Sequence, residues 1–352
     1  MTLVRHLAAA VVVALIVVLL STELSAYRDY QMAEVAAYVT AVAGLTVLIG
    51  LSGQISIGHG AFMAIGGYAA ALLLIHLGWP LEAVFAASAV IAAVAGAVFG
   101  IAAARLRGPY LAGATLMLAV ALPTIANQYP KAFGGDQGLS VSIATPAFLG
   151  ATFPPTRWMA WVTCAAALIA LILLANLGRS RVGRNWRAVR DDEVAAALSG
   201  LNVARLQVLA FVVSAACAGL GGALLAVVTG IVAPGAYTLT LSIALLTAAV
   251  LGGLGTLPGA LWGSLLLVLV PTYLTNVATS HGLSGGASSS VPIAAYGVVL
   301  IVVMLVFPAG IQGGLRRLLG FPATAPLNPL RRRAPAGEPQ EEGPNEKITS
   351  GQ

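Results

Sequence analysis

The chain has 352 residues, of which 59% are hydrophobic and 9% are charged, and its net charge is +6. Soluble domains carry about 25% charged residues, so a chain this poor in charge cannot cover itself with a water-compatible surface. A soluble globular protein is therefore excluded, and the lipid bilayer must act as the solvent. The 18 basic residues are mostly arginines gathered in loops. That distribution is typical of topology determinants and of contacts with lipid headgroups or partner proteins, and not of nucleic-acid binding.

Continuous apolar runs of about 20 residues predict membrane-spanning α-helices, because the strands of a membrane barrel are shorter and alternate in polarity. We expect an all-α polytopic integral membrane protein with about ten transmembrane helices. The expected spans are residues 7–25, 33–51, 58–77, 82–104, 109–128, 157–177, 206–229, 238–255, 258–277 and 291–307. Leu24 stands where a signal peptidase needs a small residue, so we expect the first span to be retained.

Positive charges beside the spans predict the topology. The basic clusters are Arg5, Arg105 with Arg107, the loop 178–205, and Arg316 with Arg317. Even numbers of expected spans separate them, so all clusters and both termini are expected in the cytoplasm. Residues 1–320 would form one transmembrane domain, and the Pro-rich tail 321–352 a disordered cytoplasmic segment. On the opposite side, the segment 129–156 is either a partner-binding surface or a plain connecting loop.

Two segments interrupt the apolar helices with glycine and proline, residues 50–62 and 251–260. Irregular backbone at membrane depth persists only when it is buried in protein or lines a cavity, and in transporters such interruptions point to the substrate path. His59 lies in the first segment, close to Gln54 and Ser56. It is either a packed, hydrogen-bonded structural residue or a direct contact of the substrate.

The sequence lacks the residue patterns of catalysis, ATP binding and metal binding. Its two lysines, Lys131 and Lys347, follow no phosphate-loop glycine pattern, so any ATP would bind to another chain. The four histidines have no ligand spacing, and we expect no metal site. One acidic cluster, 191–193, has no second partner of the kind that magnesium-dependent lipid enzymes use. We therefore expect no enzymatic activity.

Ionisable residues inside the spans are scarce. Glu23, Glu34 and Glu82 fall near the ends of expected spans, where they can reach water. Ion-coupled secondary transporters usually place such groups in mid-span. Their scarcity argues against that class, although unwound backbone carbonyls can also bind sodium.

The loop 178–205 holds nine of the chain's 30 charged residues. We expect Asp191, Asp192 and Glu193 to open a short helix, because the helix dipole favours anions at its N-terminus. Gly200 is a natural C-terminal stop. A short helix of small residues in a basic loop suits docking into a groove of a soluble partner; the alternative is a loop that only obeys the charge rule for topology.

Several motifs resemble the permease family of ABC importers for branched-chain amino acids, specifically the larger of the two permease subunits. The most specific block is Ser180-Arg-Val-Gly-Arg-Asn-Trp-Arg-Ala-Val-Arg-Asp-Asp-Glu-Val-Ala-Ala196. The other matching motifs are residues 50–62, 66–68, 106–112, 115–116, 134–139, 200–203, 209–214, 252–256 and 307–310. The resemblance extends over about residues 39–314. The fold that it implies is a permease of about ten spans, related to the importers of vitamin B12 and iron complexes.

The resemblance assigns roles to particular residues. It implies that the loop 178–205 contains a coupling helix that docks on a separate ATP-hydrolysing subunit. The implied coupling residues are Arg187, Arg190, Asp191, Asp192, Glu193, Ala196 and Gly200. The candidates for lining the substrate path are Gln54, Ser56, His59, Gly252, Gly253 and Gly255.

The resemblance also implies an assembly in the bacterial inner membrane. This chain would work with a second permease, two ATPase chains that bind ATP and Mg²⁺, and an extracytoplasmic binding protein, with no cofactor and no nucleic acid on the chain itself. The expected substrates are leucine, isoleucine and valine. Import of urea or short-chain amides by the same architecture, and an ion-coupled secondary transporter, stay open as alternatives.

Overall fold

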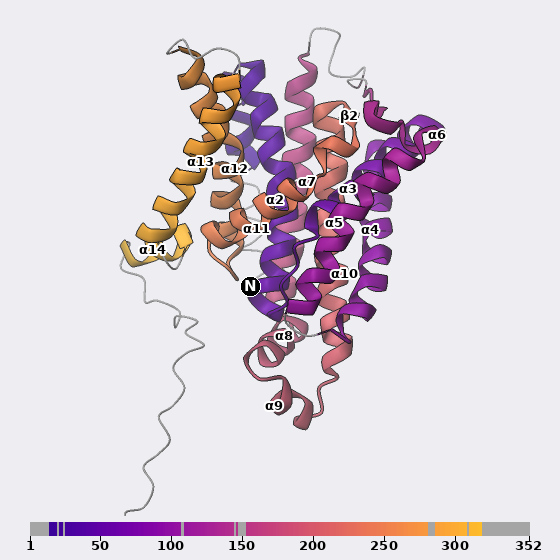
Figure 1. Cartoon of the computed structure of the whole chain (residues 1–352), viewed down its shortest axis with the longest axis vertical. Helices are drawn as coiled ribbons and strands as arrows, with labels where there is room; N and C mark the ends of the chain where they lie inside the picture. The colour runs from indigo at the N-terminus through magenta and orange to yellow at the C-terminus, as the bar shows by residue number, and fades with distance from the viewer. Residues whose placement is uncertain are drawn as a thin grey trace, which may run out of the picture.

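Long α-helices dominate the structure, as the apolar runs predict (Figure 1). The computed structural model describes residues 14–19, 21–23, 25–106, 109–143, 146, 153–280, 286–307 and 310–318. The long helices are α2 (Ala26–Ser52), α3 (His59–Leu72), α4 (Leu81–Ala103), α5 (Pro109–Gln128), α7 (Pro155–Arg179), α10 (Val203–Thr229), α11 (Leu239–Gly252), α12 (Leu257–Ser280) and α13 (Gly286–Val306). The shorter elements are η1 (Leu73–Leu77), α6 (Pro130–Phe133), η2 (Gly135–Gln137), β1 (Leu139–Ser140), α8 (Arg181–Asp191), α9 (Glu193–Leu198), β2 (Ile231–Val232), η4 (Pro234–Ala236) and α14 (Gly310–Leu318).

In the described part of the chain, eight helices are long and apolar enough to cross a membrane. The number is nine if the pair Ala294–Val306 and Gly310–Leu318, bent by 45°, is one span. The expected first span, 7–25, overlaps only the short helix Ala14–Glu23, and residues 1–13 lie outside the described part. A polytopic helical membrane protein is confirmed, but ten spans are not. The expected tail 321–352 also lies outside the described residues.

The centre of the bundle is α10, which packs against α2, α3 and α4. Glycines let these helices touch. A Cβ atom on Gly222 of α10 would lie 1.8 Å from the carbonyl oxygen of Met63, and one on Gly66 of α3 would lie 2.0 Å from that of Gly219. Lipid tails are as apolar as the helices, so close van der Waals contact between small residues is what holds spans together. On another side of α2, α11 and α12 pack as a second layer that carries α13 and α14.

The two ends of the bundle are built differently. The helices α8 and α9 project from one end, and α6 and β2 lie at the other (Figure 1). At that second end, β1 pairs antiparallel with β2, with Leu139 opposite Val232. This short ladder ties the segment 129–156 to the connection between α10 and α11. The charge pattern predicts the same separation of the loop 178–205 from this segment.

Helix α2 starts at Ala26, before the predicted start of the span at residue 33. Glu34 therefore lies inside the helix, as its ninth residue, and is half-buried. The polar residues that follow Ala26 are the reason why the sequence predicts a later start for this span. Asp29, only 1% exposed, forms an ion pair with Arg157 of α7, with Nε and Oδ2 3.6 Å apart. A charge of this kind can be buried because it is paired.

Candidate functional site

The loop between α7 and α10 consists of two capped helices. The Ser180 hydroxyl accepts hydrogen bonds from two amides in the first turn of α8. The Asp192 carboxylate accepts hydrogen bonds from the amides of Val194 at 2.9 Å and Ala195 at 3.0 Å, at the start of α9. These side chains satisfy amides that have no partner within their helix. The sequence therefore fixes both helix starts locally.

The predicted short helix is confirmed, with a shift in its first residues. Asp192 is the cap, Glu193 is the first residue of α9, and Asp191 is the last residue of α8. Gly200 has a φ of +83° just after the helix, a conformation that favours glycine. The chain then reverses into α10, whose start is capped by the Asn202 side chain.

Helix α8 was not predicted as a separate element. Its anchor is Trp186, which is fully buried and donates a hydrogen bond from Nε1 to the carbonyl oxygen of Leu206 at 2.8 Å. Val189, one turn later, is also buried. The signal for this helix in the sequence is the spacing of Val182, Trp186 and Val189, which places all three on one helical face.

The two faces of α9 have opposite characters. Ala196 is 4% exposed and faces the chain itself, whereas Val194 and Leu198 are 69% and 85% exposed. Residues four apart lie on the same side of a helix, so the two exposed side chains form one apolar pair. On the other side, Glu193 Oε1 accepts a hydrogen bond from Gln207 Nε2 of α10 at 2.9 Å. Helix α9 is thus held at its base and apolar at its tip.

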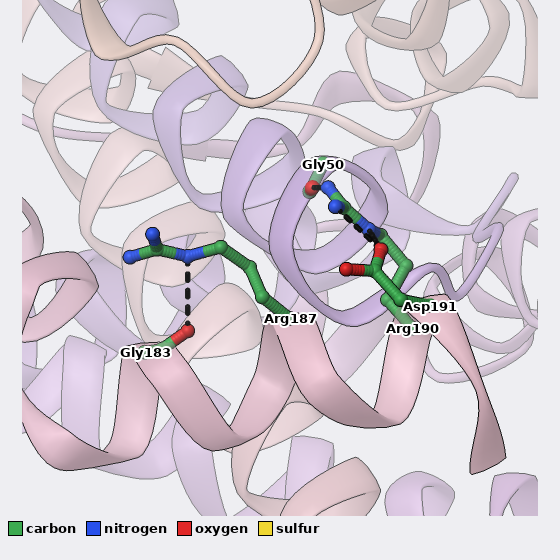
Figure 2. A network of polar contacts seen from close by, with 5 residues as sticks. All are labelled: Gly50, Gly183, Arg187, Arg190 and Asp191. Carbon is green, nitrogen blue, oxygen red and sulfur yellow. Dashed lines mark hydrogen bonds and ion pairs between the residues drawn. The ribbon is translucent and has the colours of Figure 1, made fainter. Parts of the chain in front are cut away.

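Arg190 connects α8 to the membrane-embedded part of the chain (Figure 2). Its Nη1 donates a hydrogen bond to the carbonyl oxygen of Gly50 at 2.5 Å, and its Nε and Nη2 donate to Asp191 Oδ1 at 2.9 and 2.7 Å. Gly50 lies in the last turn of α2, where carbonyl groups lack partners within the helix. A cation also interacts favourably with this end of the helix dipole. Arg190 therefore caps α2 from the neighbouring loop.

Arg187 lies one turn before Arg190, and its hydrogen bonds stay within the loop and the end of α7. Its Nε donates a hydrogen bond to the carbonyl oxygen of Gly183 at 3.2 Å (Figure 2). Its Nη2 donates to the carbonyl oxygen of Gly178. Both acceptors belong to the junction of α7 and α8, so this side chain stiffens the loop where it leaves the membrane.

The first glycine-rich interruption is an extended segment, 53–58, between α2 and α3. Gln54 and Ser56 are buried, whereas Ile55 between them is 50% exposed. This alternation is that of an extended chain with one side turned inward. Gln54 Nε2 donates hydrogen bonds to Ser52 Oγ at 2.5 Å and to the carbonyl oxygen of Gln207 at 3.2 Å. Gln207 is thus the common partner of this segment and of Glu193.

His59 begins α3 in the interior of the bundle and is 1% exposed. Its Nε2 lies 2.7 Å from Ser214 Oγ, which itself donates a hydrogen bond to the carbonyl oxygen of Gly44 at 2.8 Å. Because that hydroxyl proton is engaged, the network assigns the imidazole proton to Nε2. On the other side of the ring, Nδ1 lies 3.4 Å from Ser56 Oγ. The structure thus places His59 among this chain's own side chains.

Hydroxyl side chains from other helices satisfy the free amides of the interruption. The amide of Ile57 donates to Thr115 Oγ1 of α5, and the amide of Gly60 donates to Ser242 Oγ of α11, both at 3.0 Å. Unsatisfied amides would be costly at membrane depth. In the sequence, Thr115 and Ser214 stand in family motifs to which no role was assigned, and Ser242 was not singled out. Each is a hydroxyl residue in a largely apolar helix, but the same helices carry other hydroxyl residues, so the sequence alone does not single them out.

The second interruption lies between α11 and α12. Gly253 and Gly255 have φ values of +115° and +78°, which L-residues with side chains rarely adopt. Gly252 and Gly253 are buried and Gly255 is exposed. A Cβ atom on Gly50 would lie 2.2 Å from the amide nitrogen of Gly255. The end of α2 therefore meets the second interruption directly, next to Arg190.

The predicted coupling and path residues form one connected region. Arg190 binds the end of α2 at Gly50, which also meets Gly255 of the second interruption. Glu193 is linked to Gln54 of the first interruption through Gln207. Gln54, Ser56 and His59 line the inner side of the first interruption. Loop and interruptions are thus mechanically linked.

Comparison with known proteins identifies the family of the chain. A family model described as "Branched-chain amino acid transport system / permease component" matches residues 27–308. The high-affinity branched-chain amino acid transport system permease protein LivM of Escherichia coli K12 is 32% identical over 255 residues, which are 66% of this chain and 60% of LivM. This chain therefore spans less than two thirds of the length of that relative.

Two further relatives are matched over most of their length. LivH of Escherichia coli K12 is 30% identical over 293 residues, and BraD of Pseudomonas aeruginosa is 30% identical over 292 residues. Each alignment covers 78% of this chain and 91% of the relative, and both relatives are high-affinity branched-chain amino acid transport system permease proteins. No solved structure gives a significant match. The chain belongs to the family of branched-chain amino acid transport system permease components.

Proposed function

We propose that this chain is the membrane-spanning permease subunit of an ATP-driven ABC importer for leucine, isoleucine and valine. The observation that carries the proposal is the hydrogen bond from Arg190 of α8 to the carbonyl oxygen of Gly50 at the end of α2, where Gly50 also contacts the second interruption at Gly255. An importer of this type needs such a connection. ATP is hydrolysed on subunits at the cytoplasmic surface, whereas the switch between outward-facing and inward-facing states occurs within the membrane. In this proposal the chain lies in the bacterial inner membrane and has both termini in the cytoplasm.

In this proposal, α9 docks on an ATPase subunit. Val194 and Leu198 supply an apolar contact at the tip of the loop, where an exposed pair needs a partner to leave water. Asp192 and Gly200 fix the start and end of α9, and buried Ala196 lets it lie close to its own chain. The chain itself supplies no catalytic residue, and ATP and Mg²⁺ belong to the ATPase.

The link through Arg190 then transmits the movement of the loop. When the ATPase pair closes, α8 and α9 shift together, since Arg187 stiffens their junction with α7. Arg190 carries the shift to the end of α2, and the contact between Gly50 and Gly255 carries it to the second interruption. Packed interfaces of this type switch between discrete arrangements rather than deforming continuously. The two access states of the importer would be two such arrangements.

The substrate path is proposed to pass the first interruption. Gln54, Ser56 and His59 hold the extended segment from its inner side, and Ile55 presents an apolar surface on its exposed side. An aliphatic amino acid side chain suits such a wall. A second permease subunit would close the path, and an extracytoplasmic binding protein would deliver substrate at the end that carries α6 and the β1–β2 ladder. The glycines 252, 253 and 255 form the second flexible point of this path.

The proposal is tested with the chain and its co-purifying subunits in proteoliposomes. ATP-dependent uptake of labelled leucine, inhibited by isoleucine and valine, is the expected result. Uptake of labelled urea or acetamide without uptake of leucine would assign the other solute class. Uptake driven by a sodium or proton gradient, with no ATPase present, would overturn the importer.

The loop has its own control in the same assay. Replacing residues 191–200 with a Gly/Ser stretch should abolish uptake while the protein still inserts in the membrane. Normal uptake by that variant would contradict the coupling role of α9.

A further inference from the structure

A second surface of the chain, unrelated to the loop contacts, lies between α4 and α10 at the same end of the bundle as α8 and α9. A groove of about 540 Å³ opens there between the end of α4 and the start of α10. Its lining residues are Ile101, Ala104, Arg105, Ala204, Arg205, Val208, Leu209 and Val212. The walls are largely aliphatic, and two arginines line the groove, Arg105 just after α4 and Arg205 in the first turn of α10.

Small residues create the groove. Gly100 brings α4 close to α10, because a Cβ atom there would lie 3.1 Å from the Cβ of Phe211. Beyond this contact, Ala104 and Ala204 have side chains too short to fill the space between the diverging helix ends. The opening therefore follows from the sequence of both helices.

The groove continues a surface that faces lipid. Val90, Val94 and Val98 of α4 are 61%, 61% and 62% exposed, and Ile101, which follows them on the same face, is 56% exposed. An apolar row with this exposure on a membrane span is a lipid contact. An acyl chain lying along the row would reach the groove without leaving the hydrocarbon region.

The two arginines are free to bind an anion. Arg105 and Arg205 are both exposed, and neither guanidinium has a hydrogen-bond or ion-pair partner among the residues that the structure describes. A guanidinium presents several N–H donors in a plane that matches phosphate oxygens. Basic pockets between spans on the cytoplasmic side recognise anionic lipid headgroups.

We propose that this groove binds an anionic phospholipid of the cytoplasmic leaflet, with its phosphate between Arg105 and Arg205 and an acyl chain against Ile101, Val208 and Val212. The lipid would cover the joint between α4 and the first turns of α10. Because α10 follows the loop 178–205 directly, bound lipid would also steady the base of α9.

Native mass spectrometry of the detergent-purified, delipidated full chain tests the site, with phosphatidylglycerol and phosphatidylcholine as probes. Wild-type chain should bind phosphatidylglycerol in preference. The variant R105Q/R205Q should lose about 30-fold of that preference, the loss expected when two arginine charges are removed from an anionic bilayer surface. The variant R181Q/R184Q removes the same charge from the exposed face of α8 and should bind as wild type.

Two further measurements keep the proposal falsifiable if the glutamine variant folds poorly. The charge-conserving R105K/R205K should keep most of the preference. In wild-type chain, a photoreactive phosphatidylglycerol should label peptides covering 101–105 and 204–212. Equal binding of both lipids, equal loss in the α8 control, or labelling elsewhere would overturn the site. If crosslinking in native membranes joins the groove residues to an ATPase or a second permease, and not to lipid, the groove is a protein interface and the proposal is overturned as well.

Discussion

Gly50 and Gly255, 205 positions apart in the sequence, are in direct backbone contact: a Cβ atom on Gly50 would lie 2.2 Å from the amide nitrogen of Gly255 and 2.3 Å from its Cα. The carbonyl oxygen of the same Gly50 accepts the hydrogen bond from Arg190. One residue thus joins α2, the break between α11 and α12, and the loop that contains α8 and α9. Its lack of a side chain is what permits all three to meet.

Replacing Gly50 with alanine should therefore separate the two interruptions. The new methyl group would meet backbone atoms that cannot rotate away, and overpacking of this kind typically costs about 1–3 kcal/mol. We expect a lower melting temperature of the detergent-purified chain and reduced uptake. The matched control is Gly113→Ala in α5, where a Cβ atom would meet nothing within 4 Å. Gly113→Ala should keep or raise the melting temperature, since alanine favours a helix over glycine by about 1 kcal/mol. Equal stability of the two variants would refute the contact.

Arg190 should prove more sensitive than its neighbours on α8. Arg190→Ala leaves the carbonyl oxygen of Gly50 unpaired at the end of α2, and a hydrogen bond to a charged group contributes about 1.5–3 kcal/mol. We expect uptake to fall roughly 10- to 100-fold while ATP hydrolysis continues, which is the signature of lost coupling. Arg184→Ala removes an exposed guanidinium that donates a hydrogen bond to the carbonyl oxygen of Arg179 within the same loop, and it should retain uptake. A common loss of uptake and ATP hydrolysis in the Arg190 variant would indicate a folding or assembly defect instead.

The sequence predicts the local features of this region well. The helical membrane fold, the two interruptions and the short helix before Gly200 all follow from composition and from residues that act within a few positions of themselves. Asp192, for example, caps the helix that begins next to it. Such features need no knowledge of the rest of the chain.

Contacts across the fold could not be predicted in this way. Nothing near Gly50 in the sequence indicates Gly255 or Arg190 as a partner, and nothing near His59 indicates Ser214. The polar residues around Asp29 argued against a helix until its partner Arg157 was in place. The missed contacts of Gly50, His59 and Asp29 therefore have a common cause, which is that each joins residues more than 100 positions apart in the sequence.

The apolar tip of α9, formed by Val194 and Leu198, should contribute to the affinity for the ATPase and should not contribute to the stability of the chain. Val194→Ala with Leu198→Ala removes side chains that are 69% and 85% exposed, so the melting temperature of the isolated chain should stay unchanged. Loss of a contact residue at the centre of an interface can cost about 2 kcal/mol or more. Co-purification of the ATPase from native membranes should therefore fall at least about tenfold. A matched pair on the exposed face of α4, Val94→Ala with Val98→Ala, should retain the ATPase. Unchanged recovery with the α9 variant would move the docking surface elsewhere on the loop.

The ion pair between Asp29 and Arg157 should be a structural tie at the opposite end of the bundle. Asp29→Asn leaves the arginine, 22% exposed, without its partner in a largely apolar surrounding, and breaking a buried pair by removing one partner costs about 3–5 kcal/mol. Partial exposure of Arg157 reduces this loss. We therefore expect the free energy of unfolding, measured by denaturant titration in detergent, to fall by about 3 kcal/mol, the lower end of this range. Replacing both residues with leucine should restore much of the loss, because an apolar pair of similar volume has no charge to desolvate. If the double variant is as unstable as Asp29→Asn, the charges themselves, and not the packing of α2 on α7, hold this end of the bundle together.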